Sequence, residues 1–515
     1  MADIAGSRTL KSQWNDTVKF YPDSVFLEYV NTSDEHSVYT YAEFDKKVRR
    51  AANVFLELGV KKGELVALHM RNSPEYLVCL LALAQIAAVS VPMNEHYRME
   101  ESLYVLNKCG IKRLVADERS LPVYLPHLDE LPLDTIITAR GEIEDNRIIS
   151  VTEMMAKQPF ELREERSVES MDTAVILFTS GTTRHPKGAI YTHCNVIYGG
   201  LLHASQIVME RGDRFLSSMP CYHMDFQEMA LMPVICTGNT LIMLEHFSAR
   251  RFWRQICDYK ANFTDIMSTM CRTMMMRPVE DFEKHHSLKQ VYFSMGLSNE
   301  EKEQFEQRYG VRLLNSYGMT ETVSAVTCAP LFGDKNWPSV GRPALSYDIK
   351  IIDEFGQELP PDTAGEICVH GVPGRTLVAG YFDEPEETAM LIDAEGWLHS
   401  GDKGYLDKDG WLFFLDRRAN MIKRSGENIS TLEVECIINS NKKVADAAVV
   451  GVPDTIRDQA VKAFVQVMEG ESLSDQELID YCAARLSKFK VPTIVEFVSE
   501  FPRTATGKIR KKLLQ

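Results

Sequence analysis

Paired cysteines are missing from this sequence: none of its 11 cysteines forms a C-x-x-C pair, and their number is odd. Disulfide frameworks and structural zinc sites normally depend on such pairs or on even, regularly spaced sets. We therefore expect buried thiols in a reducing compartment and no metal bound through cysteine.

Long apolar runs and export signals are also missing. The most apolar segment, Tyr76–Pro92, is interrupted by Gln85 and is short for a bilayer span, so a buried helix followed by a strand explains it better. Residues 1–16 lack the charged start and apolar core of a signal peptide. These features predict a cytoplasmic protein without a membrane span.

The sequence has fewer positively charged than negatively charged residues. The 57 lysines and arginines are outnumbered by 73 aspartates and glutamates, which gives a formal net charge of -16. Long-range repulsion opposes association with nucleic acids or anionic membranes, so neither is an expected partner. The 515 residues, 45% hydrophobic and 25% charged, are enough for two or more domains.

What the sequence does contain is a repeated alternation of strand and helix patterns. Thr40-Tyr41-Ala42-Glu43 is a capping box that starts a helix, residues 65–70 predict a strand, and another helix is predicted from about Ser73. The alternation continues beyond residue 240. Because alternating strands and helices imply crossover connections, we expect an α/β fold with stacked, largely parallel sheets covered by helices.

The C-terminal third departs from this alternation. Residues 339–381 are rich in strand patterns with Gly and Pro turns, which predicts a small antiparallel or β-barrel-like subdomain. Residues 416–430 are basic and polar, and a compact mixture of helix and strand patterns follows them. We place a boundary near Asp416, with an N-terminal domain at 1–416 and a small α+β domain at 417–515.

The segment after the apolar run 174–178 has the composition of a phosphate-binding loop. Its glycine, hydroxyl and lysine residues are Thr179, Ser180, Gly181, Thr182, Thr183 and Lys187. Glycine lets several backbone N–H groups converge, hydroxyls add donors, and the ammonium supplies charge to a polyphosphate. The pattern G-x-x-x-x-G-K-[ST] is excluded, because Pro186 and Gly188 stand where it requires Gly and then Ser or Thr. A polar surface turn is the alternative interpretation.

A second motif, NSYGMTET, follows a predicted strand. Tyr317, with Gly318 beside it, can stack on a nucleotide base. Thr320 can donate a hydrogen bond to a phosphate oxygen, and Glu321 can hold a Mg²⁺ ion that shields phosphate charge. An ordinary strand end is the alternative for this motif.

Two further motifs lie nearer the C-terminus. Asp402 stands in a Ser-Gly-Asp turn, where a carboxylate suits the adjacent hydroxyls of a ribose, and turn capping is the alternative. Arg417 follows the next predicted strand. Lys508 comes after a Gly-containing turn in FPRTATGKIRKKLL, and a solvated basic tail is the alternative for that run.

Taken in order along the chain, these motifs resemble the signatures of the adenylate-forming enzymes, which include acyl-CoA synthetases, luciferases and peptide-synthetase adenylation domains. The resemblance covers essentially the whole chain. It implies an enzyme that uses ATP, Mg²⁺ and coenzyme A, with the 179–187 loop on pyrophosphate and Glu321 on Mg²⁺. It also implies that Asp402 and Arg417 bind the ribose and that Lys508 meets the substrate carboxylate and the α-phosphate. The candidate catalytic residues are Lys508, Thr320 and His223.

The same resemblance implies a two-step reaction. A carboxylate first attacks the α-phosphorus of ATP, which gives an acyl-adenylate and pyrophosphate, and the CoA thiol then displaces AMP. Between the steps the C-terminal domain swings as a mobile lid about a hinge near Ala419, so that Gly426 lines a pantetheine tunnel while His223 lies near the acyl pocket and thiol entry. Many relatives carry an acidic residue or lysine at the hinge, so a charged hinge contact is not expected here. The oligomeric state is left open, with a homo-oligomer as one alternative.

Within this family the chain resembles the ligases that act on carnitine, crotonobetaine or γ-butyrobetaine. A quaternary ammonium group requires aromatic faces or a carboxylate, for which Tyr222, Asp225 and Phe226 are candidates. Met295 stands where relatives often have a Gly-Gly-Ala-Pro stretch, which favours a small acid over a long fatty chain. The alternatives are a CoA ligase for another short-chain or aryl acid, an enzyme that loads a carrier protein, and a catalytically silent nucleotide-binding protein.

Overall fold

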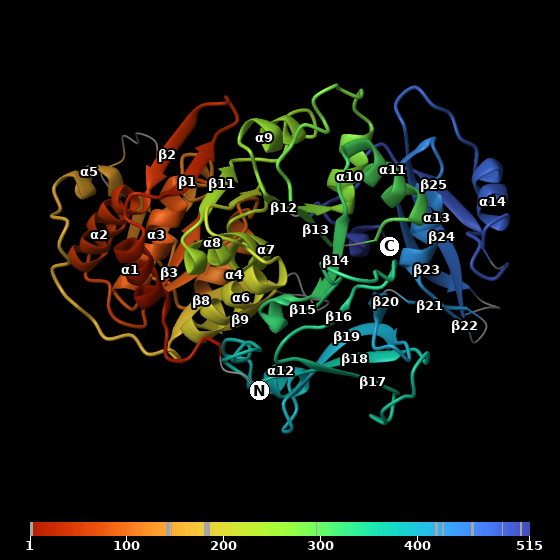
Figure 1. Cartoon of the computed structure of the whole chain (residues 1–515). Coiled ribbons are helices and arrows are strands. Elements are labelled where there is room, and N and C mark those ends of the chain that lie inside the picture. Colours follow the sequence, from red (N-terminus) through yellow and green to blue (C-terminus); the bar gives the residue numbers. More distant parts are fainter. Residues whose placement is uncertain are drawn as a thin grey trace.

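Four sheets organise the chain in a computed structural model (Figure 1). The structure describes residues 4–140, 145, 147–179, 186–294, 296–417, 421–424, 427–454, 458–486, 488–504 and 507–514. Within these residues no helix has the length and apolar character needed to cross a membrane. All eleven cysteines are free thiols that are buried or half-buried.

The first sheet has seven strands, and most of its pairs are parallel. In spatial order they are β7 (Ile148–Ser150), β6 (Thr135–Thr138), β5 (Arg113–Ala116), β3 (Leu65–His69), β4 (Val89–Pro92), β8 (Thr173–Thr179) and β9 (Lys187–Thr192). The β8–β9 pair is antiparallel and places Thr179 opposite Lys187. Lys187 therefore begins a strand, which corrects the expectation that it lies in the loop, because antiparallel pairing extends the hairpin up to this residue.

The second sheet has nine strands. In spatial order they are β16 (Arg342–Pro343), β15 (Ala325–Cys328), β14 (Leu313–Gly318), β13 (Gln290–Ser294), β12 (Phe263–Met267), β10 (Arg214–Ser217), β11 (Thr240–Leu244), β1 (Val25–Val30) and β2 (His36–Thr40). The run from β14 to β1 is parallel, and antiparallel strands occupy both edges.

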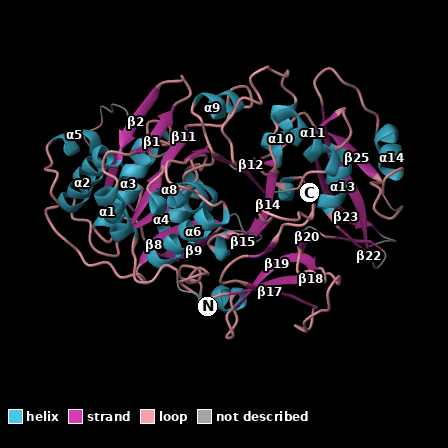
Figure 2. Ribbon diagram, in the orientation of Figure 1, coloured by secondary structure: helices cyan, strands magenta, loops and turns pink. Residues whose placement is uncertain are grey.

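Helices fill the space between these two sheets (Figure 2). Helix α2 (Tyr41–Glu57) contacts β1 and β2, α3 (Pro74–Gln85) contacts β3 and β4, and the two helices contact each other. Helix α1 (Leu10–Phe20) packs on both of them and on α6 (His193–Gln206) and α8 (Met232–Thr237). The remaining α-helices of this part are α4 (Met99–Lys108), α5 (Val151–Ala156), α7 (Met224–Phe226), α9 (Phe252–Asp258), α10 (Ser268–Met275), α11 (Asn299–Tyr309) and α12 (Pro385–Leu391). Because one apolar core contacts both sheets, the expected α/β fold with stacked, largely parallel sheets is confirmed.

Local sequence signals explain where the helices begin. Thr40 accepts a hydrogen bond from the backbone N–H of Glu43, and the Glu43 carboxylate accepts one from the Thr40 backbone, so the expected capping box is present. Ser73 caps α3 in the same position, ahead of a proline in the first turn. The strand expected at 65–70 is β3.

A third sheet occupies the strand-rich region. Its order is β17 (Asp348–Ile352), β18 (Gly365–His370), β19 (Trp397–Leu406) and β20 (Leu412–Arg417), with every pair antiparallel. The antiparallel character matches the prediction. The order is linear, so the sheet is open rather than barrel-like, because four strands are too few to close around a filled interior.

The C-terminal part forms a small separate sheet with its own apolar core, drawn in blue in Figure 1. Its strands run β22 (Glu427–Ile429), β21 (Ile422–Arg424), β24 (Asp458–Val467) and β23 (Val444–Asp454), and β25 (Ile494–Phe497) pairs in parallel with β24. Helices α13 (Thr431–Asn439) and α14 (Asp475–Ala483) complete a small α+β unit. The chain leaves the third sheet after Arg417 and enters this one at Ile422.

Candidate active site

Strand β14 carries Tyr317, the first residue of the site. The Tyr317 hydroxyl donates a 2.8 Å hydrogen bond to the Asp402 carboxylate, and the Tyr317 ring lies 5.7 Å from the ring of Phe414. Asp402 is 3% exposed and stands opposite Arg417 in the β19–β20 pair. The structure thus brings together the residue expected to stack on the base and the residue expected to bind the ribose.

A tight turn at Thr320–Thr322 follows β14 directly. Gly318 is required just before it, since a Cβ there would lie 2.7 Å from the Ser324 carbonyl oxygen. The buried Glu321 carboxylate accepts a 2.6 Å hydrogen bond from the Tyr381 hydroxyl. The Thr320 carbonyl accepts a 2.5 Å hydrogen bond from the hydroxyl of Tyr191 on β9.

Tyr381 links this turn to Lys187. Residues 379–382 pair with β9 through backbone hydrogen bonds, which include a bridge between Ala189 and Tyr381. The Lys187 ammonium lies 5.0 Å from the centre of the Tyr381 ring and forms an ion pair with Glu387 on α12. Lys187 therefore lies near the ring of Tyr381, and Glu321 accepts a hydrogen bond from its hydroxyl. Tyr381 thus brings a cation and a carboxylate from distant segments of the chain close together.

The start of α7 contributes a second pair of ionisable groups. His223 Nδ1 lies 3.2 Å from the Asp225 amide nitrogen and 3.3 Å from its carboxylate. Burial acts to raise the pKa of Asp225, but its contact with His223 and the charge of Lys508 outweigh burial and hold that pKa below its ordinary value. Lys508, on the C-terminal unit, therefore lies near enough to act on a carboxylate of the N-terminal part.

The turn that carries Lys508 is held by a chain of ion pairs across the two parts. Arg503 donates to the Gly507 carbonyl at 3.0 Å and to the Asp446 carboxylate at 2.6 Å. Arg272 of α10 lies 3.8 Å from the same carboxylate. Asp446 thus connects the N-terminal part to the turn that positions Lys508.

Several predicted residues have no structural description. Ser180, Gly181, Thr182, Thr183, Met295, Ala419 and Gly426 lie outside the described residues, and only the backbone of Arg417 is described. Thr179 is the last residue of β8. The phosphate, hinge and pantetheine roles assigned to these residues stay predictions.

Sequence reasoning missed four residues that the structure places here: Tyr191, Tyr381, Glu387 and Asp446. The sequence motifs assign a role to none of them. Each meets its partner through a contact across at least 57 positions of sequence. Spacing within a segment carries no signal for such contacts.

Comparisons with known proteins show the family to which the chain belongs. Residues 14–382 match the family described as AMP-binding enzyme, and residues 433–508 match the AMP-binding enzyme C-terminal domain. Because the first match alone covers well over half of the chain, the chain belongs to the AMP-binding enzyme family.

Individual proteins and solved structures are also similar to this chain. The crotonobetaine/carnitine–CoA ligase of Proteus mirabilis is 41% identical over 517 residues, with 100% of both chains covered, and that of Salmonella typhimurium is 40% identical over 516 residues, also with 100% of both covered. Among solved structures, the anthranilate CoA ligase AuaEII in complex with anthranoyl-AMP matches with a TM-score of 0.90 at 23% identity, covering 99% of this chain and 96% of that one. The o-succinylbenzoate CoA synthetase of Bacillus subtilis, in complex with its acyl-adenylate, matches with a TM-score of 0.85 at 26% identity, covering 99% and 98%.

Proposed function

We propose that this protein is an ATP-dependent acid:CoA ligase that activates carnitine, crotonobetaine or γ-butyrobetaine as an acyl-adenylate and transfers the acyl group to CoA. The observation that carries the proposal is the likeness, at 40–41% identity over the full length, to ligases named for these substrates. The converging groups of the site support it. A cytoplasmic location and the absence of nucleic-acid partners belong to the same proposal.

The first step brings together two anions, a carboxylate and a triphosphate, so fixed cations must stabilise the charge that develops. Lys508 is the group for the carboxylate and the α-phosphate, since it reaches the vicinity of Asp225 and His223. Lys187 is the group for the departing pyrophosphate, and its present ion pair with Glu387 holds it beside the site. Tyr317 and Asp402 bind the nucleoside, the first by stacking and the second through the ribose hydroxyls.

A magnesium ion fits the residues at the turn after β14. Mg²⁺ usually takes one or two protein carboxylates together with substrate phosphates. The part of the chain that the structure describes has no cluster of three or more His, Cys, Asp or Glu side chains, and such a cage is not needed here. Glu321 supplies the carboxylate, and Tyr381 orients it through a 2.6 Å hydrogen bond. When bound, the ion neutralises phosphate charge.

The second step requires the thiol of CoA to reach the adenylate. We assign residues 1–416 to the domain that binds the nucleotide and residues 417–515 to a lid that turns about Ala419. This rotation moves Lys508 away from the reaction centre and brings Gly426 to it. Domain rotation between half-reactions lets one site perform both.

Pyrophosphate exchange across a panel of acids tests this function. Purified protein is incubated with ATP, labelled pyrophosphate and one acid at a time, and AMP formation is then followed after CoA is added. We expect exchange and AMP formation with betaine acids at rates above those for simple aliphatic and aryl acids. Exchange that occurs with an aliphatic or aryl acid and not with any betaine contradicts the substrate assignment, and AMP formation that does not depend on CoA contradicts ligation.

A further inference from the structure

A buried carboxyl group lies one helical turn beyond the Asp225–His223 pair. Glu228 belongs to a π-helical turn, Gln227–Leu231, that continues α7. It is 1% exposed, and its Oε2 atom has no hydrogen-bond partner among the residues that the structure describes. An unpaired carboxyl in such surroundings is unfavourable, so it stays protonated unless a cation compensates it. Burial accordingly raises the pKa of Glu228 well above its ordinary value.

The fold makes room for this carboxyl at Gly199 of α6, and the next residue, Gly200, makes room for Met232. A Cβ at Gly199 of α6 would lie 2.7 Å from Glu228 Oε2 and 3.3 Å from the Val323 side chain. A Cβ at Gly200 would lie 2.7 Å from Met232 Cβ and 2.9 Å from its backbone. Glycine inside a helix is destabilising by roughly 0.5–1 kcal/mol relative to alanine. Helix α6 therefore has glycines, which lower its stability, at the two positions where Glu228 and Met232 pack against it.

Through Gly199, Glu228 is close to the residues that follow the Glu321 turn. Val323, which shares the Gly199 contact, comes two residues after Glu321 and has a φ of +66°. That backbone conformation is strained for a β-branched residue, and such strain is concentrated at functional sites. From Asp225 to Glu228 the helix rises about 4.5 Å. Glu228 is therefore about one helical turn away from the carboxyl on which the charge of Lys508 acts.

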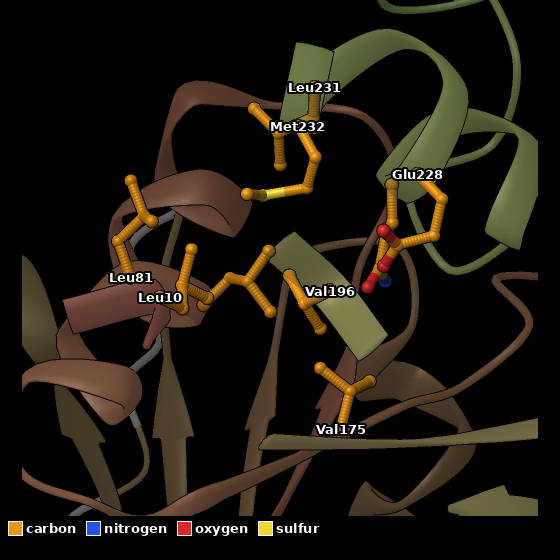
Figure 3. A pocket seen from close by; sticks show the side chains of 9 residues that line it. Leu10, Leu81, Val175, Val196, Glu228, Leu231 and Met232 are labelled. Carbon is orange, nitrogen blue, oxygen red and sulfur yellow. The ribbon is translucent and has the colours of Figure 1, made fainter. Parts of the chain in front are cut away.

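Aromatic residues and apolar walls surround the carboxyl. Burial chiefly raises the pKa of Tyr191 and Tyr347, and Glu228 in its ionised form would raise the pKa of both further. Their hydroxyls donate to backbone carbonyls of Thr320 and Thr322. Figure 3 shows the Glu228 side chain beside Val196 at the edge of a small apolar void. No other described residue that lines this void is charged.

We propose that Glu228 is the counter-ion for the quaternary ammonium group of the substrate, with Tyr191 and Tyr347 as its aromatic neighbours. A quaternary ammonium has no N–H to donate, so it is bound by negative charge and aromatic faces rather than by hydrogen bonds. A buried carboxyl whose Oε2 atom has no hydrogen-bond partner among the described residues matches that chemistry. Asp225 is less suited, because His223 and Lys508 already compensate its charge. This inference rests on the proposed betaine substrate.

Two acids of the same shape, one with and one without the ammonium charge, show how much that charge contributes to recognition. γ-Butyrobetaine carries a trimethylammonium group, and 5,5-dimethylhexanoate has a carbon in place of that nitrogen. Pyrophosphate exchange is measured for both acids with the wild type, Glu228→Gln and Asp225→Asn, and thermal unfolding and ATP binding confirm that each variant is folded. Glutamine keeps the size and neutrality of the protonated carboxyl, so folding is expected to persist.

We expect the wild type to prefer the betaine. Glu228→Gln should lower kcat/KM for γ-butyrobetaine by roughly 30-fold or more and leave the neutral acid unchanged or improved. Asp225→Asn should slow both acids alike. An equal loss for both acids in Glu228→Gln, or no loss for the betaine, overturns the inference, and loss of selectivity in Asp225→Asn instead assigns the counter-ion to Asp225. If the wild type activates only the neutral acid, the proposed function is wrong as well as the role of Glu228. If the wild type prefers the betaine but Glu228→Gln does not lose that preference, only the role of Glu228 is wrong.

Discussion

Asp446 offers a direct perturbation of the contact that holds Lys508 in place. Its carboxylate lies 2.6 Å from Arg503 of the Lys508 turn and 3.8 Å from Arg272 of the N-terminal part. The Asp446 side chain is 10% exposed, so solvent screens these contacts only weakly. Asp446→Asn keeps the shape of the side chain and removes its charge.

The expected effect follows from the strength of charged hydrogen bonds. Losing one net contact of this kind costs about 2 kcal/mol, which corresponds to a roughly 30-fold slower reaction if the contact forms only when Lys508 is in place. The first half-reaction is measured by pyrophosphate exchange and the second by CoA thioester formation from supplied acyl-adenylate. We expect Asp446→Asn to slow the first about 30-fold and to leave the second within twofold.

The control removes a more exposed ion pair within the C-terminal unit. Glu433 and Lys490 lie 2.7 Å apart, and neither contributes to the Lys508 turn. Glu433→Gln should therefore change neither half-reaction. If Asp446→Asn slows both half-reactions equally, or slows neither, the positioning role is wrong.

Three further predictions concern the nucleotide, the metal and acid stability. Tyr381→Phe removes the hydrogen bond to Glu321 and should raise the Mg²⁺ concentration needed for half-maximal exchange about tenfold, and an unchanged Mg²⁺ titration would argue against Glu321 as the ligand. Tyr317→Ala should weaken ATP binding by about 1–3 kcal/mol in calorimetry, whereas Tyr317→Phe keeps the ring and should change it far less. Burial lowers the pKa to about 4 for three histidines: His69, His193 and His203. Between pH 6.5 and 4 these histidines bind protons in the unfolded chain but not in the folded one. As the pH is lowered from 6.5 to 4, the free energy of unfolding should therefore decrease by up to about 3 kcal/mol per histidine. Unfolding curves recorded at successive pH values check this, and a flat response would contradict it.

The motifs and the alternation of elements were predictable because they are local. Helix caps such as Thr40 and strands such as β3 depend on neighbouring residues, and the order of the motifs identifies the family. The position of Lys187 on β9 was not predictable in the same way, since it depends on antiparallel pairing with β8. The open third sheet likewise depends on which strands pair.

The contacts that complete the site arise from long-range packing. Tyr381 reaches Glu321 because residues 379–382 pair with β9, which no periodicity in either segment indicates. Asp446 reaches Arg272 only through the approach of two separately folded parts. In the sequence Glu228 resembles any acidic residue on a helix, and its unusual character comes from its burial against Gly199 of α6.

The central claim is that a lysine carried by the C-terminal unit completes a site on the N-terminal part for the first half-reaction. Lys508→Ala tests it most directly, with pyrophosphate exchange and thioester formation from supplied acyl-adenylate measured on the same preparation. We predict that exchange is largely abolished while thioester formation is retained. An equal loss of both half-reactions would contradict the account.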